Sequence, residues 1–162
     1  MEKARIIQTD GFLLAGMPME MSLNKDQTNI LWQAFMPRRQ AIPQPIGHDL
    51  YSVEIYPSGF EMATFDNSTV FTKWAAVRVA SADNLPRNMK PLQIPKGRYA
   101  VFIHHGVAKD FSKTAAFIYE EWLPKSGYML DQRPHFEVMG KKYYGPIDPR
   151  SQEEVYIPVR PA

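Results

Sequence analysis

The chain repeats one order of local patterns in its two halves: a strand, a helix and two further strands. In the first half these are residues 12–21, 24–36, 50–56 and 70–80, and in the second 98–106, 110–123, 135–139 and 153–159. The strands alternate apolar and polar residues, and the helices show apolar positions three and four apart. Pro37 and Pro124 are predicted to end the two helices, because proline lacks the amide hydrogen and clashes with the preceding turn.

A strand–helix–strand–strand unit cannot bury both faces of its own sheet, so two units are expected to pack side by side. The predicted fold class is α+β, with two pseudo-symmetric repeats forming one antiparallel sheet, the helices on one face and a central ligand cleft on the other. A polar segment with three prolines, about 81–97, connects the first repeat (about 1–80) to the second (about 98–162). A chain of 162 residues fits a single domain, 1–162.

Composition excludes several classes of function. The net charge is +2 and the basic residues are scattered, so no direct nucleic-acid binding is expected. The chain has no cysteine and no apolar run of about 20 residues, which predicts a cytoplasmic protein without a membrane span. The histidines His48, His104, His105 and His135 lack metal-ligand spacing, and no phosphate-binding loop occurs, so no metal and no cofactor are predicted.

Alternation sorts the strand residues into two faces. One face of each strand is more purely aliphatic, and these faces are predicted to lie against the helices. The other faces carry acidic and aromatic residues and are predicted to converge on the cleft; the candidates are Glu54, Glu137, Tyr56, Trp74, Phe102 and Tyr156. Trp122 lies on the core face of the second helix, with a lip over the cleft as its alternative role.

The segments KWAAVRV (73–79), IPKGRYAVFIHHG (94–106), IYEEWLPKSGYML (118–130), HFEVMG (135–140) and EEVYIPVRP (153–161) occur in an order that resembles the GyrI-like small-molecule-binding domain family. This module is also found at the C-terminus of some bacterial AraC- and MerR-type transcription regulators. The resemblance implies an aromatic-lined pocket for amphipathic, often cationic compounds, in which an acid on a late strand pairs with the ligand's charge. Glu137 matches that acid. Phe136 and the run Trp74-Ala75-Ala76 depart from the family pattern.

The predicted function is a stand-alone binding protein for amphipathic, cationic small molecules. Burial would raise the pKa of Glu137, and a ligand cation between it and aromatic rings would gain both Coulombic and cation–π attraction. The alternative for Glu137 is a solvated position at the rim, or a pair with Lys141 or an arginine nearby. Two further functions remain open: a hydrolase of reactive xenobiotics that uses Glu137 and Tyr156, and a protein that binds a macromolecular partner, a regulator or gyrase.

Overall fold

A bend at Gly11 joins two strands into one long ribbon. Strand β1 (Arg5–Thr9) runs into β2 (Phe12–Met21), and Gly11 between them has a φ of +90°. A side chain there would also meet the backbone oxygen of Ile94 at 2.8 Å. Strand β5 (Lys90–Ile94) runs in the same way into β6 (Gly97–His105). The two bent strands pair along both arms, so the ribbon turns a corner as a unit.

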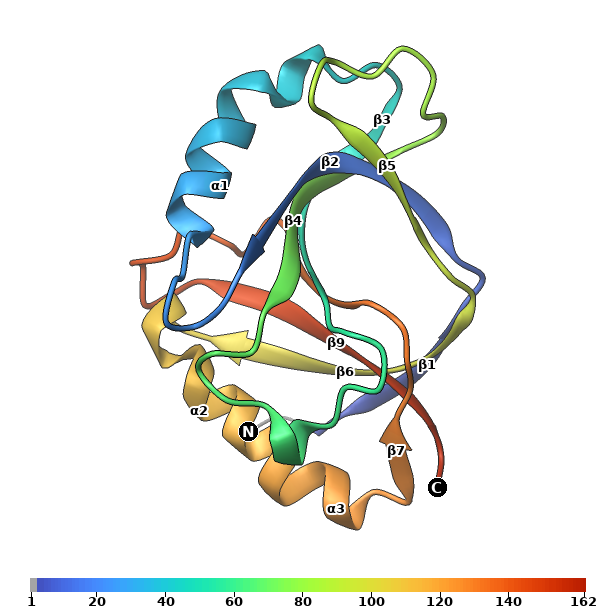
Figure 1. Ribbon diagram of the computed structural model, residues 1–162, viewed down its shortest axis with the longest axis vertical. Helices are drawn as coiled ribbons and strands as arrows, with labels where there is room; N and C mark the ends of the chain where they lie inside the picture. The colour runs from blue at the N-terminus through green and yellow to red at the C-terminus, as the bar shows by residue number, and fades with distance from the viewer. Residues whose placement is uncertain (1–2) are drawn as a thin grey trace.

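The computed structural model describes residues 3–162 and forms a curled, antiparallel sheet (Figure 1). The remaining strands are β3 (Pro45–Ile55), β4 (Phe71–Val79), β7 (Tyr128–Leu130), β8 (His135–Met139) and β9 (Gln152–Pro161). The order across the sheet is β1-β6-β9-β8-β3-β4-β2-β5, and β7 pairs with β9. Because the ribbon of β1–β2 paired with β5–β6 supplies the two outer strands at each end of this order, the sheet curls back on itself.

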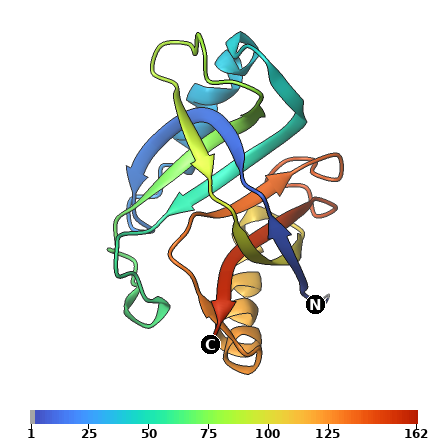
Figure 2. The ribbon, with the colours of Figure 1, turned by 90° about the vertical axis from the view of Figure 1, so that its right-hand side faces the viewer.

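Two helical segments cross the outside of the curl. The first comprises α1 (Thr28–Phe35) and a 3-10 turn, η1 (Met36–Ala41). The second comprises η3 (Ala108–Asp110), α2 (Phe111–Ala116), the π-helical η4 (Phe117–Trp122) and α3 (Leu123–Lys125). A short 3-10 turn, η2 (Met62–Thr64), lies between β3 and β4. Figure 2 shows both long segments behind the strands.

Within residues 3–162 the hydrophobic core has three parts. One fills the inside of the curl and includes Tyr51, Trp74, Tyr99 and Phe136. The second packs α1 on β2, β3 and β4, and the third packs the α2 segment on β6 and β9. We call the side of the sheet within the curl the inner face and the side under the helices the outer face. Both faces are therefore buried, which is why the strands contain so few consecutive polar residues.

The α+β antiparallel architecture predicted from the sequence is confirmed, and strands 12–21 and 135–139 have the predicted bounds. Several details differ. The first helix starts at Thr28 rather than at residue 24, and the Thr28 amide donates a hydrogen bond to Asp26. Neither proline ends its helical segment: the 3-10 turn η1 continues past Pro37, and α3 contains Pro124, each proline standing near the start of its element. Strand β3 begins at Pro45 rather than at residue 50. The predicted connector 81–97 contains strand β5, and strands β1 and β7 were not predicted.

The two halves of the sheet arrange their corresponding strands in the same order from the centre outward. Strands β3, β4 and β2 lie on one side of the β3–β8 pair, and β8, β9 and β6 lie on the other. Each set supplies a strand before its helix and two strands after it, in the predicted sequence order. An evolutionary duplication stays a prediction. Within residues 3–162, no helix has both the length and the apolar character needed to cross a membrane.

Candidate ligand-binding site

The register of the two central strands brings two glutamates together. Val53 of β3 pairs with Phe136 of β8, and the acids Glu54 and Glu137 each follow one residue later. They are therefore diagonal neighbours on one face of an antiparallel pair, within reach of each other. Both are buried, with Glu54 9% and Glu137 7% exposed. Glu137 is thus not a solvated glutamate, which answers one alternative left open by the sequence.

This acidic pair lies on the outer face, under the helical segments. Glu54 is the register partner of Lys73, whose neighbours on the same face of β4, Phe71 and Ala75, pack against α1. From the other helical segment, the Tyr119 hydroxyl lies 3.2 Å from Nδ1 of His135, two residues before Glu137. The prediction that the acids face a cleft opposite the helices is wrong: they lie between the two helical segments and the sheet.

The pKa values of the two carboxyl groups are shifted unequally. Burial raises the pKa of both, and a hydrogen bond between them raises that of Glu137 further while lowering that of Glu54. The charge of Glu54 also raises the pKa of Glu137. Two close carboxylates in a desolvated site cannot both ionise readily. Glu137 therefore holds a proton and donates it to Glu54, well above the pH at which a free glutamate ionises.

Lys73 and Glu153 extend the charged centre. Burial lowers the pKa of Lys73, but the charges of Glu54, Glu137 and other acids outweigh this and raise it, so the ammonium is kept. Burial raises the pKa of Glu153 to about 7, and the charge of Glu54 adds to the increase while Lys73 opposes it. No acidic side chain within residues 3–162 lies within ion-pair distance of Lys73. Its ammonium thus acts on the acids through space.

Aromatic and imidazole rings form one wall of this acidic centre. The Tyr56 ring lies 4.9 Å from the His135 ring and stacks on Phe60 at 4.2 Å. Burial and the charge of Arg133 lower the pKa of His135 to about 3, so its imidazole is neutral. Burial, with the charges of Glu54 and Glu137, raises the pKa of Tyr119 above its ordinary value. Tyr119 consequently keeps its proton and donates it to Nδ1 of His135.

One hydrogen-bond acceptor in the acidic centre has no donor among the described residues. Oε2 of Glu54 is buried and has no hydrogen-bond partner within the described part of the chain. An unpaired buried polar atom costs about 1–3 kcal/mol, and more when it carries charge. The centre therefore presents a carboxylate oxygen that a donor or a cation would stabilise. Among residues 3–162 no group of His, Asp or Glu has the arrangement of a metal site.

The other predicted site residues divide between the two faces. Trp74 pairs with Val53, and Tyr156 pairs with Phe136, so both belong to the inner face. The predicted placement of these two rings beside the acids is wrong, and the suggested catalytic pair of Glu137 and Tyr156 is not formed. Phe102 is on the outer face but packs under the α2 segment, where Trp122 contacts it edge-on at 5.0 Å. Trp122 thus has its expected place in the core.

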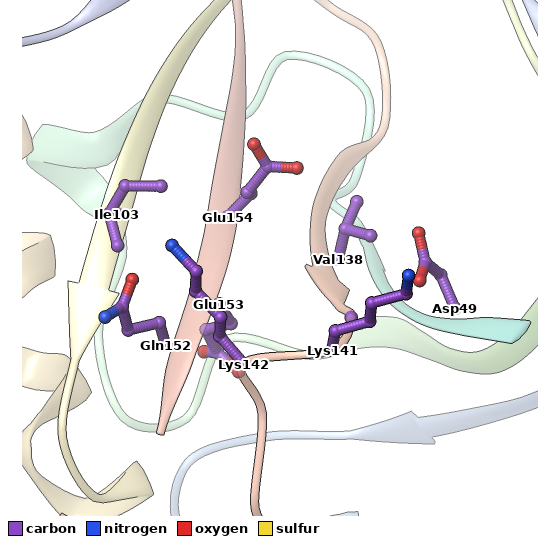
Figure 3. A pocket seen from close by; sticks show the side chains of 9 residues that line it. Asp49, Ile103, Val138, Lys141, Lys142, Gln152, Glu153 and Glu154 are labelled. Atoms are coloured by element: carbon purple, nitrogen blue, oxygen red, sulfur yellow. The ribbon is translucent and has the colours of Figure 1, made fainter. Parts of the chain in front are cut away.

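A hollow of about 460 Å³ opens where β8 and β9 separate, beside the end of β6 (Figure 3). Ile103, Val138 and Glu154 line it from the inner face, so the hollow and the acidic pair lie on opposite sides of the sheet. Glu153 of the acidic centre borders the hollow from β9. In Figure 3 the Lys141 side chain extends toward Asp49, and Lys142 extends along β9. Within residues 3–162 no ion pair joins Lys141 to Glu137, so the pairing considered from the sequence is not formed.

Sequence reasoning missed four residues of the centre: Lys73, His135, Tyr119 and Glu153. Lys73 and His135 could have been found, because period 2 places them on the faces of Phe71 and Glu137. Tyr119 is three residues before Trp122 on the helix, so the two residues share a side of it. Because Trp122 was predicted to face the core, Tyr119 could have been expected to point toward the sheet. Glu153 shares a face with Val155, which was assigned to the helix side as an aliphatic residue.

Comparison with known proteins places this geometry in a family. Residues 2–160 match the GyrI-like small molecule binding domain. The chain belongs to the GyrI-like family. Among the curated proteins, it is similar to the transcriptional regulator BrlR of Pseudomonas aeruginosa, with 28% identity over 156 residues that cover 96% of this chain and 55% of BrlR. The GyrI-like chain spans about half the length of the curated relatives that it matches.

Solved structures show the same GyrI-like fold. SAV2435 bound to tetraphenylphosphonium superposes with a TM-score of 0.73 at 14% identity, covering 98% of this chain and 94% of SAV2435. A hydrolase of Listeria innocua superposes with a TM-score of 0.58 at 11% identity, covering 98% of this chain and 92% of the hydrolase. At these identities the likeness extends to the fold alone. The predicted membership of this family is confirmed, and with it the function of a small-molecule-binding domain.

Proposed function

We propose that this GyrI-like domain binds amphipathic organic cations between its helical segments and the sheet, with Glu137 and Glu54 as the counter-charge. The observation that carries the proposal is the buried Oε2 of Glu54, which has no partner in the described residues and lies beside a second buried carboxyl. The location is proposed to be cytoplasmic, in keeping with a chain without cysteine.

The site suits a cation that is large and apolar. A small hydrated ion would lose its hydration without full replacement, whereas a diffuse organic cation loses little. Tyr56, Phe60 and Tyr119 offer ring surface within the same region, and a cation over a ring gains about 0.5–2 kcal/mol. The relative SAV2435 was solved with tetraphenylphosphonium, a cation of this class. This supports tetraphenylphosphonium as a first probe here.

Calorimetric titration with tetraphenylphosphonium and with neutral triphenylphosphine oxide tests the proposal. We expect the wild type to favour the cation, and Glu137→Gln to weaken its binding by about 10- to 100-fold, the range for a lost charged interaction. Glu20→Gln, at an exposed position on β2, is the matched control and should bind as the wild type does. Equal affinity for the cation and the oxide, or a Glu137→Gln protein that binds the cation normally, would refute the proposal.

A second candidate function is hydrolysis of reactive small molecules. The observation that favours it is one protonated and one ionised carboxyl in a shared buried site, an arrangement that suits general acid and base catalysis. A fold relative is a hydrolase. Tyr119, rather than Tyr156, would be the nearby phenol. Turnover of an electrophilic substrate that Glu137→Gln abolishes, with the fold retained, would favour this function; a protein partner such as gyrase stays a prediction.

A further inference from the structure

A second hollow lies on the inner face, on the opposite side of the sheet from the acidic centre. It has a volume of about 360 Å³ and opens beside the bend between β1 and β2. Its lining includes residues 7–12 of that bend, together with Tyr51, Arg78, Phe136, Val138 and Tyr156. This volume lies in the range of small-molecule sites, about 300–1,000 Å³.

Aromatic rings form the floor of the hollow. Phe136 stacks on Tyr156 with ring centroids 4.5 Å apart, and Phe12 meets Phe136 edge-on at 5.6 Å. The Tyr51 ring completes the group, 6.2 Å from Phe136. Such a floor offers flat apolar surface to a planar ring, which prefers offset or edge contacts with its neighbours.

Arg78 supplies the charge of this hollow. Its guanidinium carbon lies 4.9 Å from the centroid of the Phe12 ring, and it also interacts with the Tyr51 phenol. No carboxylate of residues 3–162 pairs with Arg78 within ion-pair distance. Glu154 nearby is already bound to Arg5 at 2.8 Å and accepts a hydrogen bond from Tyr156. The remaining charged lining residue, Asp10, is exposed in the bend.

We propose that this inner-face hollow is a second small-molecule site, which takes planar aromatic anions. The carboxylate of such a ligand would meet the planar guanidinium of Arg78, a geometry that allows two parallel hydrogen bonds. Its ring would rest on Phe136 and Tyr156. The two faces would thus bind ligands of opposite charge, and this proposal does not rest on the cation site.

Titration calorimetry with 1-naphthoate, and with neutral 1-naphthalenemethanol, tests the second site. We expect one naphthoate per chain, bound more tightly than the alcohol, and weakened about tenfold or more in Arg78→Gln. Arg98→Gln is the matched control, because Arg98 is also half-buried and lies 5.9 Å from the Tyr128 ring, outside the hollow. It should bind naphthoate normally, and so should Glu137→Gln.

Three results would overturn the proposal: no naphthoate binding by folded wild type, an equal loss in Arg98→Gln, or a loss in Glu137→Gln with none in Arg78→Gln. Should Arg78→Gln not fold, Arg78→Lys keeps the charge but not the planar fork, and about a threefold to tenfold loss is expected. Normal naphthoate binding by folded Arg78→Lys would then count against the proposed geometry. Failure of these proteins to bind tetraphenylphosphonium would count against the proposed cation site and would leave the proposal for the inner-face hollow unaffected.

Discussion

The two faces of the central strands β3 and β8 differ in chemistry although they alternate along the same residues. On the outer face, Glu54 and Glu137 are buried beside Lys73 under the helices. On the inner face, Val53 and Phe136 pack among aromatic rings within the curl. Neighbouring residues of one strand therefore differ in kind: one set packs apolar and aromatic side chains, and the next buries ionisable groups.

The largest expected effect is a difference in the free energy of unfolding between substitutions at the neighbouring residues Phe136 and Glu137. Phe136→Ala should lower the free energy of unfolding by about 3–5 kcal/mol, because it leaves a cavity among Phe12, Tyr51, Tyr99 and Tyr156. Glu137→Gln should change it by less than about 1 kcal/mol, because Glu137 is already protonated and the amide keeps a donor for Glu54. Urea unfolding checks both variants. Similar losses in the two proteins would mean that the faces do not differ as described.

The sequence patterns of the strands predicted much of this difference between the two faces. Residues 135–139 alternate cleanly and residues 12–21 form a nearly continuous apolar run, and the structure gives both strands the predicted bounds. Alternation also placed Glu54 and Tyr56 correctly on one face, since both lie at the acidic centre. It could not tell which face the helices cover, because the curl buries the inner face as fully as the helices bury the outer one.

The errors follow from that ambiguity. Trp74 was placed beside the acids because each strand was sorted separately, and only the register shows that Glu54 lies opposite Lys73. Strand β5 was missed because Pro91 and two polar residues interrupt its pattern, and its pairing with β2 depends on the bend at Gly11. Long-range register is set by tertiary packing, which a single strand's sequence does not encode.

The second expected effect is a dependence of stability on pH. The pKa of Glu153 is raised to about 7 and that of Glu137 is also raised, so between about pH 4.5 and 7 these two carboxyls bind more protons in the folded protein than in the unfolded chain. Neutral His135 acts in the opposite direction up to about pH 6.5, because the unfolded chain protonates it. The contribution of the two carboxyls to the free energy of unfolding should therefore fall as pH rises through this window. Glu153→Gln should remove on the order of 1–2 kcal/mol of that fall, measured by urea unfolding at pH 5 and pH 8. An unchanged slope in Glu153→Gln would place this carboxyl outside the acidic centre.

The smallest expected effect concerns Lys73, whose positive charge competes with a ligand cation for the same acids. At pH 9, Lys73→Gln should bind tetraphenylphosphonium about threefold more tightly, as expected for a modest charge interaction. Lys141→Gln removes an exposed lysine that extends toward Asp49 and should leave the affinity unchanged. Weaker binding by Lys73→Gln would show that Lys73 holds the site open rather than opposing the cation.

Proton release during cation binding tests the central claim most directly. Because Glu137 is protonated in the free protein and a cation favours its ionised form, binding should expel a proton. Calorimetric titration of tetraphenylphosphonium at pH 7, in buffers with different heats of ionisation, measures the number of protons released. The account predicts about one proton for the wild type and a clearly smaller number for Glu137→Gln. Cation binding with no proton released by the wild type would contradict it.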